Sequence, residues 1–266
     1  MSDAAIPTAH RVTREQPAPS WAGQAWRQYR LERRMFWRNP SAAFFNFLLP
    51  LLFLAMFGAI FAGSRSDLDV IVPGIAGMSV MSTTFTALAM NLTTLRETGV
   101  LKRVRGTPLP ASAYLSALAG HAITNTALQV TLITVAGKLV FGTGWPRDLP
   151  SLVVFVVLGA ATFAALGVAL SHVIPNVESA PAYVNAIFLP VIMISGVVYD
   201  ESDAPNFLHE IAGALPLKHL IDGLSGAMVR GTGLGDHVTA VLMLLVWGGA
   251  GAVLAVRGFS WSARRA

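Results

Sequence analysis

The chain contains no cysteine and little charge, and each shortage excludes a class of protein. Without cysteine there is no disulfide, no thiolate metal site and no cysteine nucleophile. Charged residues make up 12% of the 266 residues, whereas soluble domains carry about 25%. Hydrophobic residues make up 54%, and the mean hydropathy is +0.58. This composition predicts an integral membrane protein.

Motifs for catalysis and for ion coupling are also missing from the sequence. There is no glycine-rich phosphate loop, no Gly-x-Ser-x-Gly elbow, no kinase signature and no cluster of metal ligands. The apolar segments described below contain no acidic residue, and Glu178 lies between two of them. Proton-coupled carriers rely on buried carboxylates, so the sequence argues against an ion-driven transporter. We expect no cofactor and no metal on this chain.

Six apolar segments are each long enough to cross about 30 Å of hydrocarbon. The predicted fold class is therefore all-α, a polytopic membrane protein with six transmembrane helices. We place the six segments at residues 41–62, 70–92, 112–140, 151–174, 181–199 and 237–257.

The distribution of charge predicts the orientation of these segments. Of the 19 Lys and Arg residues, 14 lie in the N-terminal segment, the 93–111 loop and the C-terminal tail. Nine of the 14 acidic residues lie on the other side. The positive-inside rule then places both termini and the loop in the cytoplasm. We expect the body to lie in a plasma (bacterial inner) membrane. Because this topology accounts for the basic pI of about 10.1, we expect no nucleic-acid partner.

Residues 1–20 and 21–38 differ in pattern. The first stretch is rich in Ala, Pro and Ser and has no apolar period, so we expect a disordered tail. The second is predicted to be an amphipathic helix lying in the membrane interface, with only Arg33 on its apolar side. A plain basic anchor beside the membrane is the alternative. The aromatic and basic residues on its two arcs include Trp26, Tyr29, Trp37, Arg27, Arg30 and Arg34.

The stretch 96–110 carries five charged residues between two apolar segments. One charge at mid-bilayer costs about 2.5–3.5 kcal/mol on insertion scales, so this stretch must lie in water. The pattern predicts a short charged helix from Glu97 to Arg105, stopped by the glycine and prolines that follow. It is either an ordinary positive loop or a lever that docks into a partner protein. The charged residues are Arg96, Glu97, Lys102, Arg103 and Arg105.

Polar side chains inside two of the spans form stripes at helical spacing. They predict either hydrogen bonds between helices or a path for a substrate. The stripe of the second span includes Ser79, Ser82, Thr83 and Thr86, and that of the third includes His121, Thr124, Asn125 and Gln129.

Apolar residues also recur at helical spacing in the external stretch 200–236, which predicts a helix that lies in the interface or dips into the membrane. These apolar residues are Leu217, Leu220, Ile221, Leu224 and Met228.

Three blocks in this order resemble the type-2 ATP-binding-cassette (ABC) export permeases. The block RETG to TPLP at 96–110 is similar to their cytoplasmic signature. The block NVESA to SGV at 176–197 is similar to their fifth span, and LPL to DGL at 215–224 to the element before the last span. Together the likeness covers roughly residues 25–260, and it is strongest to drug and antibiotic exporters of the daunorubicin-resistance type.

This resemblance implies an architecture and a set of partners. Residues 21–266 would form one ABC type-2 transmembrane domain, with 21–38 as an elbow helix and Glu97–Arg105 as a coupling helix. The external helices would lie between Asp200 and Arg230. The permease would work as a homodimer or heterodimer of membrane subunits in the lipid bilayer. Separate ATPase subunits, which bind ATP and Mg, would contact Arg96, Lys102, Arg103 and Arg105.

The resemblance also implies the cargo, a bulky amphipathic drug or antibiotic moved out of the cell. Export of a lipid, glycolipid or polysaccharide is the alternative, and a non-transporting scaffold or immunity subunit is a further one. A membrane-bound enzyme would depend on His209, Glu210 and His219, which are scattered in the sequence. Hydroxyl and apolar side chains of spans one, two and five are candidates for the substrate path: Phe44, Phe45, Thr83, Thr86 and Phe188.

Overall fold

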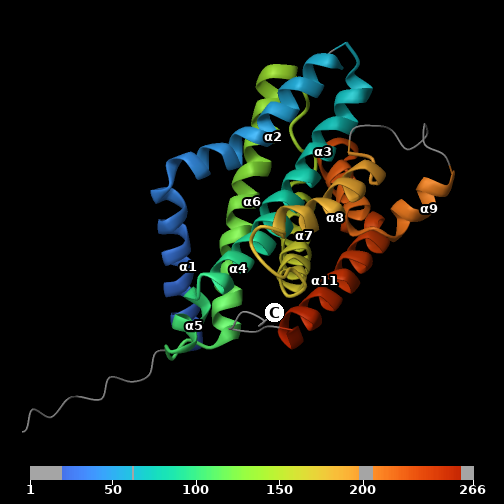
Figure 1. Cartoon of the computed structure of the whole chain (residues 1–266). Coiled ribbons are helices and arrows are strands. Elements are labelled where there is room, and N and C mark those ends of the chain that lie inside the picture. Colours follow the sequence, from blue (N-terminus) through green and yellow to red (C-terminus); the bar gives the residue numbers. More distant parts are fainter. Residues whose placement is uncertain (1–19, 62, 198–205, 259–266) are drawn as a thin grey trace, which may run out of the picture.

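A computed structural model describes residues 20–61, 63–197 and 206–258. Within those ranges the chain is helical and contains no β-strand, which confirms the all-α class for this part (Figure 1). The predicted N-terminal tail lies outside the described residues apart from Ser20. The side chain of Ser20 accepts a hydrogen bond from the Gly23 amide and begins the first helix.

The helices follow one another through short connections. The first half of the chain contains α1 (Trp21–Arg38), α2 (Pro40–Ile60), α3 (Arg65–Met81), the π-helix η1 (Ser82–Thr86), α4 (Ala87–Glu97), α5 (Val100–Arg105) and α6 (Ala111–Phe141). The second half contains α7 (Leu149–Ser171), α8 (Ala180–Ile194), α9 (Asn206–Ala214), α10 (Pro216–Ser225), the π-helix η3 (Gly226–Arg230), the 3-10 helix η4 (Leu234–His237) and α11 (Val238–Gly258).

Five helical stretches are long and apolar enough to cross a membrane, and they correspond to five of the six predicted spans. The predicted span at 181–199 is different. Its helix α8 has 15 residues, about 22 Å, which falls short of about 30 Å of hydrocarbon. Gly196 ends this segment because its φ of 71° lies in the left-handed region, which glycine adopts without strain. The five long stretches are Pro40–Ile60, Arg65–Glu97, Ala111–Phe141, Leu149–Ser171 and Leu234–Gly258.

The helix α3 forms the centre of the bundle, because every residue from Ile71 to Met81 is buried. It packs against α2, α6, α7 and α10. Gly74 allows the segment after α8 to approach, since a Cβ there would collide with the carbonyl oxygen of Val197. Small residues at helix crossings allow this close approach in membrane proteins.

The described part of the stretch 200–236 folds back into the bundle. Helix α10 packs between α3, α7 and α11, and all five apolar residues that predicted an amphipathic helix are buried. Gly77 and Gly159 face Ile221 and Leu220 of α10, at positions where a Cβ would collide with these side chains. Helix α10 is thus inserted among the other helices, and its place relative to the membrane stays a prediction.

Thr83 and Gln129, which belong to the polar stripes of the second and third spans, make hydrogen bonds between helices. Thr83 of η1 donates to the side-chain oxygen of Gln129 on α6. The amide of Gln129 in turn donates to the Asn46 carbonyl of α2 over 2.7 Å. Three helices are therefore linked through one polar chain inside the bundle, which favours the packing role for these residues.

Candidate functional site

Helix α5 presents its basic side chains to solvent at the end of the molecule where α1 begins and α11 ends (Figure 1). Lys102, Arg103 and Arg105 are exposed, as the charge pattern predicts. The predicted helix from Glu97 to Arg105 is corrected by the structure. Gly99 has a φ of 74°, so the chain turns there and a separate helix begins at Val100.

The opposite side of α5 is apolar and anchors it to the bundle. Leu101 is 2% exposed and packs in a cluster with Leu92 of α4 and with Tyr114 and Leu118 of α6. Val104 lies at the edge of the same cluster. The short helix is therefore packed against both of its neighbours, α4 and α6.

Arg96 lies inside the structure, away from the surface where the sequence pattern places it. It is buried, and its guanidinium donates to the carbonyls of Ser171 over 2.7 Å and Ile174 over 2.5 Å. Ser171 is the last residue of α7 and Ile174 lies just beyond it. Carbonyl groups at the end of a helix lack partners within the helix, and a cation is favourable there. Arg96 therefore fixes α4 to the end of α7. The sequence resemblance places it on the surface that would meet the ATPase, and its burial corrects that placement: it positions α4 instead.

Glu97 completes this attachment from the adjacent position. Its carboxylate accepts a hydrogen bond of 2.6 Å from the Val177 amide, in the connection between α7 and α8. Glu97 thus joins the block at 96–110 to the block at 176–197. Two motifs that lie about 80 residues apart in the sequence therefore meet at the end of α4, where the second span ends.

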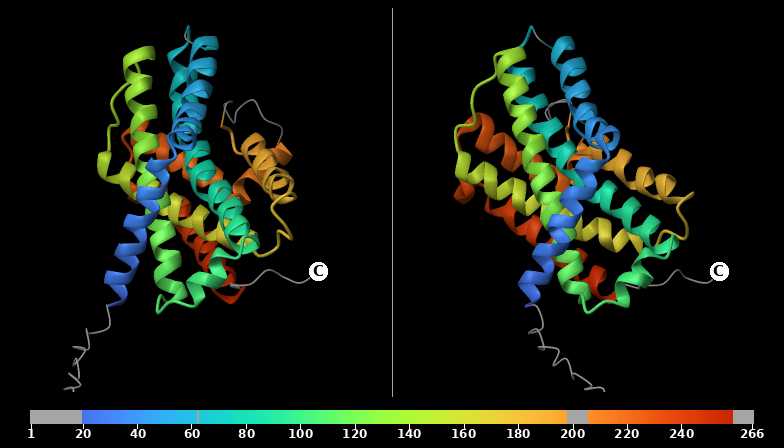
Figure 2. Two further views of the ribbon diagram at one scale, coloured as in Figure 1. Left: turned by 60° about the vertical axis from the view of Figure 1, so that its left-hand side comes forward. Right: turned by 90° about the vertical axis from the view of Figure 1, so that its left-hand side faces the viewer.

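Helix α1 forms where the sequence predicts it, but it runs beside α6 rather than across the bundle (Figure 2). The Trp21 indole donates to Ser112 over 3.0 Å, and Tyr29 bonds to Thr124 over 3.1 Å. Helix α6 has 31 residues, about 46 Å, which exceeds the hydrocarbon thickness by about 16 Å. The contacts with α1 run from Ser112 to Asn125, about 20 Å along α6, so they extend beyond this excess.

Several aromatic and basic side chains of the two predicted arcs of α1 are exposed. Trp26 and Trp37 are more than half exposed, and Trp26 stacks on Tyr29 at 5.1 Å between ring centroids. Amphipathic aromatic rings at such positions suit the membrane interface. The basic side chains of the other arc, Arg27, Arg30 and Arg34, are all exposed.

Arg33, the basic residue on the apolar side of α1, has a specific partner on α6. Its guanidinium donates to the side-chain oxygen of Asn125 over 2.6 Å, and the Asn125 amide lies 3.1 Å from the His121 ring nitrogen. The neighbouring Glu32 is also buried, where it accepts a hydrogen bond of 2.7 Å from Gln28. Burial raises the pKa of Glu32 above its usual range. Sequence reasoning missed this polar contact between α1 and α6.

We expect Arg33→Ala to lower the free energy of unfolding by about 1–3 kcal/mol, because Asn125 loses its charged partner in a buried position. Denaturant unfolding of the purified chain in detergent measures this change. Arg34→Ala is the matched control, and its exposed side chain predicts a change within about 0.5 kcal/mol. Equal effects of the two variants would contradict the assigned contact.

A cleft of about 260 Å³ lies beside α5, between α1 and the loop that follows α5. One wall contains Arg27 and Leu31, and the other contains residues 107–109. We use the name α5 surface for Lys102, Arg103 and Arg105 together with this cleft. It combines exposed cations with a concave apolar wall, which suits an acidic protein partner.

The five residues predicted for the substrate path are not gathered at one described cavity. Phe44 and Phe45 are 60% and 65% exposed on α2. Thr83 is buried against Gln129, and Thr86 and Phe188 are half-buried. On the outer stretch, His219 bonds to the Gly213 carbonyl, and the described residues include no group of three side chains placed to hold a metal ion.

The family model for the ABC-2 type transporter matches residues 24–229, which include the α5 surface and the helices from α2 to α10. This chain belongs to the ABC-2 type transporter family. The membership confirms the resemblance read from the three sequence blocks. The chain is accordingly a multi-pass membrane protein and the permease component of a transporter.

Curated relatives show the same relationship at low identity. Nodulation protein J of Rhizobium leguminosarum bv. viciae is 30% identical over 46% of this chain and 45% of its own length. The transport permease ycf38 of Porphyra purpurea, described as putative, is 27% identical over 73% of this chain and 71% of its own. The daunorubicin resistance ABC transporter permease protein DrrB1 of Streptomyces coeruleorubidus is 28% identical over 65% of this chain and 63% of its own. The match to the nodulation protein thus spans less than half of that relative.

Proposed function

We propose that this chain is the membrane subunit of an ATP-driven exporter and that the α5 surface is the seat of a separate ABC ATPase. The observation that carries the proposal is the construction of α5. Three cations face outward on a helix whose other side is packed against α4 and α6. An ordinary solvated loop has no need for a buried anchor, whereas a part that transmits force does.

The proposed orientation places the α5 surface in the cytoplasm of a bacterial inner membrane. Supporting this, α5, the start of α1 and the end of α11 share one end of the molecule (Figure 1), where α5 contributes Lys102, Arg103 and Arg105 and the end of α11 contributes Arg257. Helix α8 would complete the fifth of six crossings together with the residues that follow it. Helices α9 and α10 would then belong to the outer side.

In the proposed mechanism, ATP and Mg bind to the ATPase subunits, which close on each other and carry α5 with them. The α5 anchor passes this displacement to α4 and α6, and the Arg96–Glu97 attachment passes it to the α7–α8 connection. Movement of α8 relative to α3 would open a path between this chain and a second membrane subunit. The two membrane subunits would be identical or closely related.

The proposed cargo is a bulky amphipathic compound such as a drug or an antibiotic. The similarity to a daunorubicin resistance permease over 65% of the chain supports this choice. A second candidate, export of a lipid, glycolipid or polysaccharide, is kept because nodulation protein J has similar identity and its name specifies no drug. Phe44, Phe45, Thr83, Thr86 and Phe188 stay the proposed path residues.

Transport in liposomes tests the proposal. We expect the chain, reconstituted with its ATPase, to move a fluorescent anthracycline across the membrane only when Mg-ATP is supplied. An ATPase variant that lacks the phosphate-loop lysine is the control. Accumulation without ATP contradicts the ATP-driven mechanism, and stimulation of hydrolysis by a lipid-linked glycan alone selects the second candidate. ATPase binding without any transport would identify a scaffold.

A further inference from the structure

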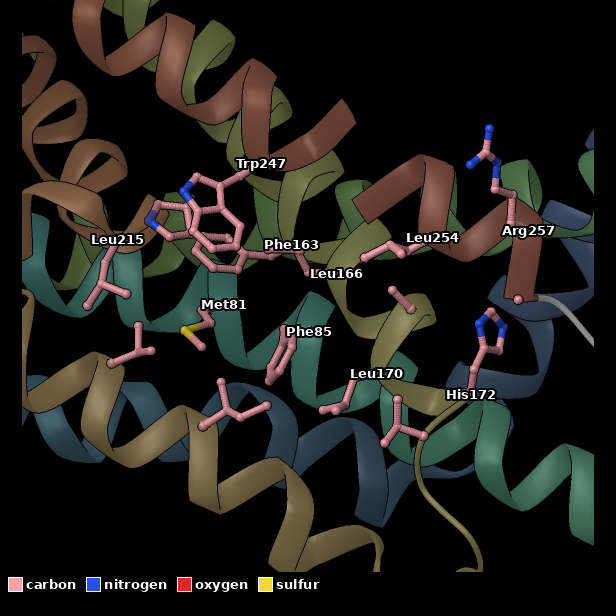
Figure 3. Close-up of a pocket in the computed structure, with 16 residues that line it drawn as sticks. Met81, Phe85, Phe163, Leu166, Leu170, His172, Leu215, Trp247, Leu254 and Arg257 are labelled. Carbon is pink, nitrogen blue, oxygen red and sulfur yellow. The ribbon is translucent and has the colours of Figure 1, made fainter. Parts of the chain in front are cut away.

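A cavity of about 620 Å³ lies between α7, α8 and α11, with the junction of α3 and η1 as its inner wall (Figure 3). Its lining is almost entirely apolar. The one indole in the wall, Trp247, donates its N–H to the Ala214 carbonyl over 3.0 Å, so it offers no free donor to an occupant. The residues that line the wall include Phe85, Phe163, Leu170, Val191, Trp247 and Leu254.

The cavity has the depth of one leaflet of a bilayer. Trp247 lies at one end and Arg257 at the other (Figure 3). Ten residues of α11 separate them, which corresponds to about 15 Å along the helix. This is half of the roughly 30 Å hydrocarbon core. A hydrocarbon chain that enters from the Arg257 end would therefore reach from the membrane surface to the bilayer centre.

The two ends of the cavity differ in polarity. The deep end is formed by Phe163, Met81 and Leu215, whereas His172 and Arg257 stand at the other end, with the guanidinium of Arg257 directed away from the other lining side chains (Figure 3). Arg257 is exposed and lies on the last turn of α11, at the same end of the molecule as α5. A cation above an apolar slot is complementary to a molecule with an anionic head and a hydrocarbon tail. Basic pockets between transmembrane helices bind anionic lipid head groups in this way.

We propose that this cavity binds an anionic phospholipid of the surrounding bilayer, with one acyl chain inside it and the phosphate beside Arg257. A bilayer lipid is favoured over a transported compound because the rim is open to the flank of the bundle. Ile187 of α8 and Leu254 of α11 are 40% and 60% exposed there. The cavity shares no residue with the α5 surface or the proposed substrate path. Only the choice of leaflet rests on the proposed orientation.

Native mass spectrometry of the full chain in detergent tests this site. The probes are phosphatidylglycerol and phosphatidylcholine with identical acyl chains, added at equal concentration. We expect the chain to retain one phosphatidylglycerol and to prefer it over phosphatidylcholine. Arg257→Ala is expected to reduce this preference about fivefold, since one cation near the membrane surface contributes roughly that factor. Arg38→Ala, which removes an exposed cation away from the cavity, is expected to leave the preference unchanged.

Filling the cavity provides the second arm of the test. Ala169→Phe places a ring inside it and is expected to abolish lipid retention. Ala161→Phe, on the same helix at an exposed position outside the lining, is the matched control. Leu254→Trp at the exposed rim repeats the test where a larger side chain is readily accommodated.

The outcomes separate this inference from its rivals. The head-group assignment is overturned if the original chain retains the two lipids equally. It is also overturned if Arg257→Ala prefers phosphatidylglycerol as strongly as the original chain does. Unchanged retention in both filling variants overturns the cavity assignment. If the filling variants lose a dimer of the chain but still retain the lipid, the face around the cavity binds a second copy of the chain, and the inference is also overturned. Because no ATPase and no transport enter the measurement, each of these results leaves the proposed exporter function untouched.

Discussion

Arg96→Ala is expected to lower the free energy of unfolding by about 2–4 kcal/mol, which is among the larger effects of a single substitution. The change removes both donors to the Ser171 and Ile174 carbonyls, and each unsatisfied buried polar group costs about 1–3 kcal/mol. Denaturant unfolding of the purified chain in detergent provides the measurement. Substrate-stimulated ATP turnover of the complex should also fall, because α4 loses its attachment to α7.

Two further variants test the role of Arg96 in detail. Arg96→Lys keeps the charge but has no planar fork, so it is expected to satisfy one carbonyl and to recover part of the lost stability. Thr94→Ala is the control on the same helix, since this exposed hydroxyl bonds only to the Met90 carbonyl of its own helix. If Arg96→Ala destabilised the chain no more than Thr94→Ala, the positioning role would be wrong.

Simultaneous replacement of Lys102, Arg103 and Arg105 by alanine is expected to weaken ATPase binding about tenfold. Each solvated ion pair contributes about 0–1 kcal/mol, so one change is close to neutral, whereas three together reach about 1.5 kcal/mol. That energy corresponds to roughly a factor of ten in the dissociation constant. Titration of the detergent-solubilised chain with its ATPase measures it, and the difference should shrink at high salt.

The control for this triple variant removes the same amount of charge from the opposite end. Arg65, Arg147 and Arg230 are exposed there, and their joint replacement by alanine is expected to leave ATPase affinity unchanged. The stability of the α5 variant should be nearly unaffected because its anchor, Leu101, is retained. Undiminished affinity and undiminished substrate-stimulated turnover in the α5 variant would refute the assigned seat.

The sequence predicts much of this fold because the relevant signals are local. Long apolar runs identify five spans, and Asn39-Pro40 marks the boundary between α1 and α2, where the Asn39 side chain accepts from the Ala42 amide. The exposed cations of α5 follow from the cost of burying charge. The sequence overestimates the length of α8 because apolar composition continues past Gly196, where the backbone conformation ends the helix.

The parts that sequence reasoning missed depend on contacts between distant residues. Arg96 and Arg103 look alike in the sequence, yet one is buried against α7 and the other is exposed. Arg33 looks like a defect in an amphipathic pattern, because its partner Asn125 lies 92 positions away. The available clue is the mismatch itself: a cation on an apolar face needs a polar partner, and the stripe on α6 offers one.

The central claim is that α5 meets the ATPase on the cytoplasmic side, and cross-linking from Arg103→Cys tests it most directly. The chain has no native cysteine, so this variant carries a single thiol. A thiol- and amine-reactive cross-linker applied to membranes that contain the whole complex is predicted to yield a covalent adduct of this chain with the ATPase. Absence of that adduct, together with labelling of the introduced thiol by an impermeant maleimide added outside intact cells, would contradict the account.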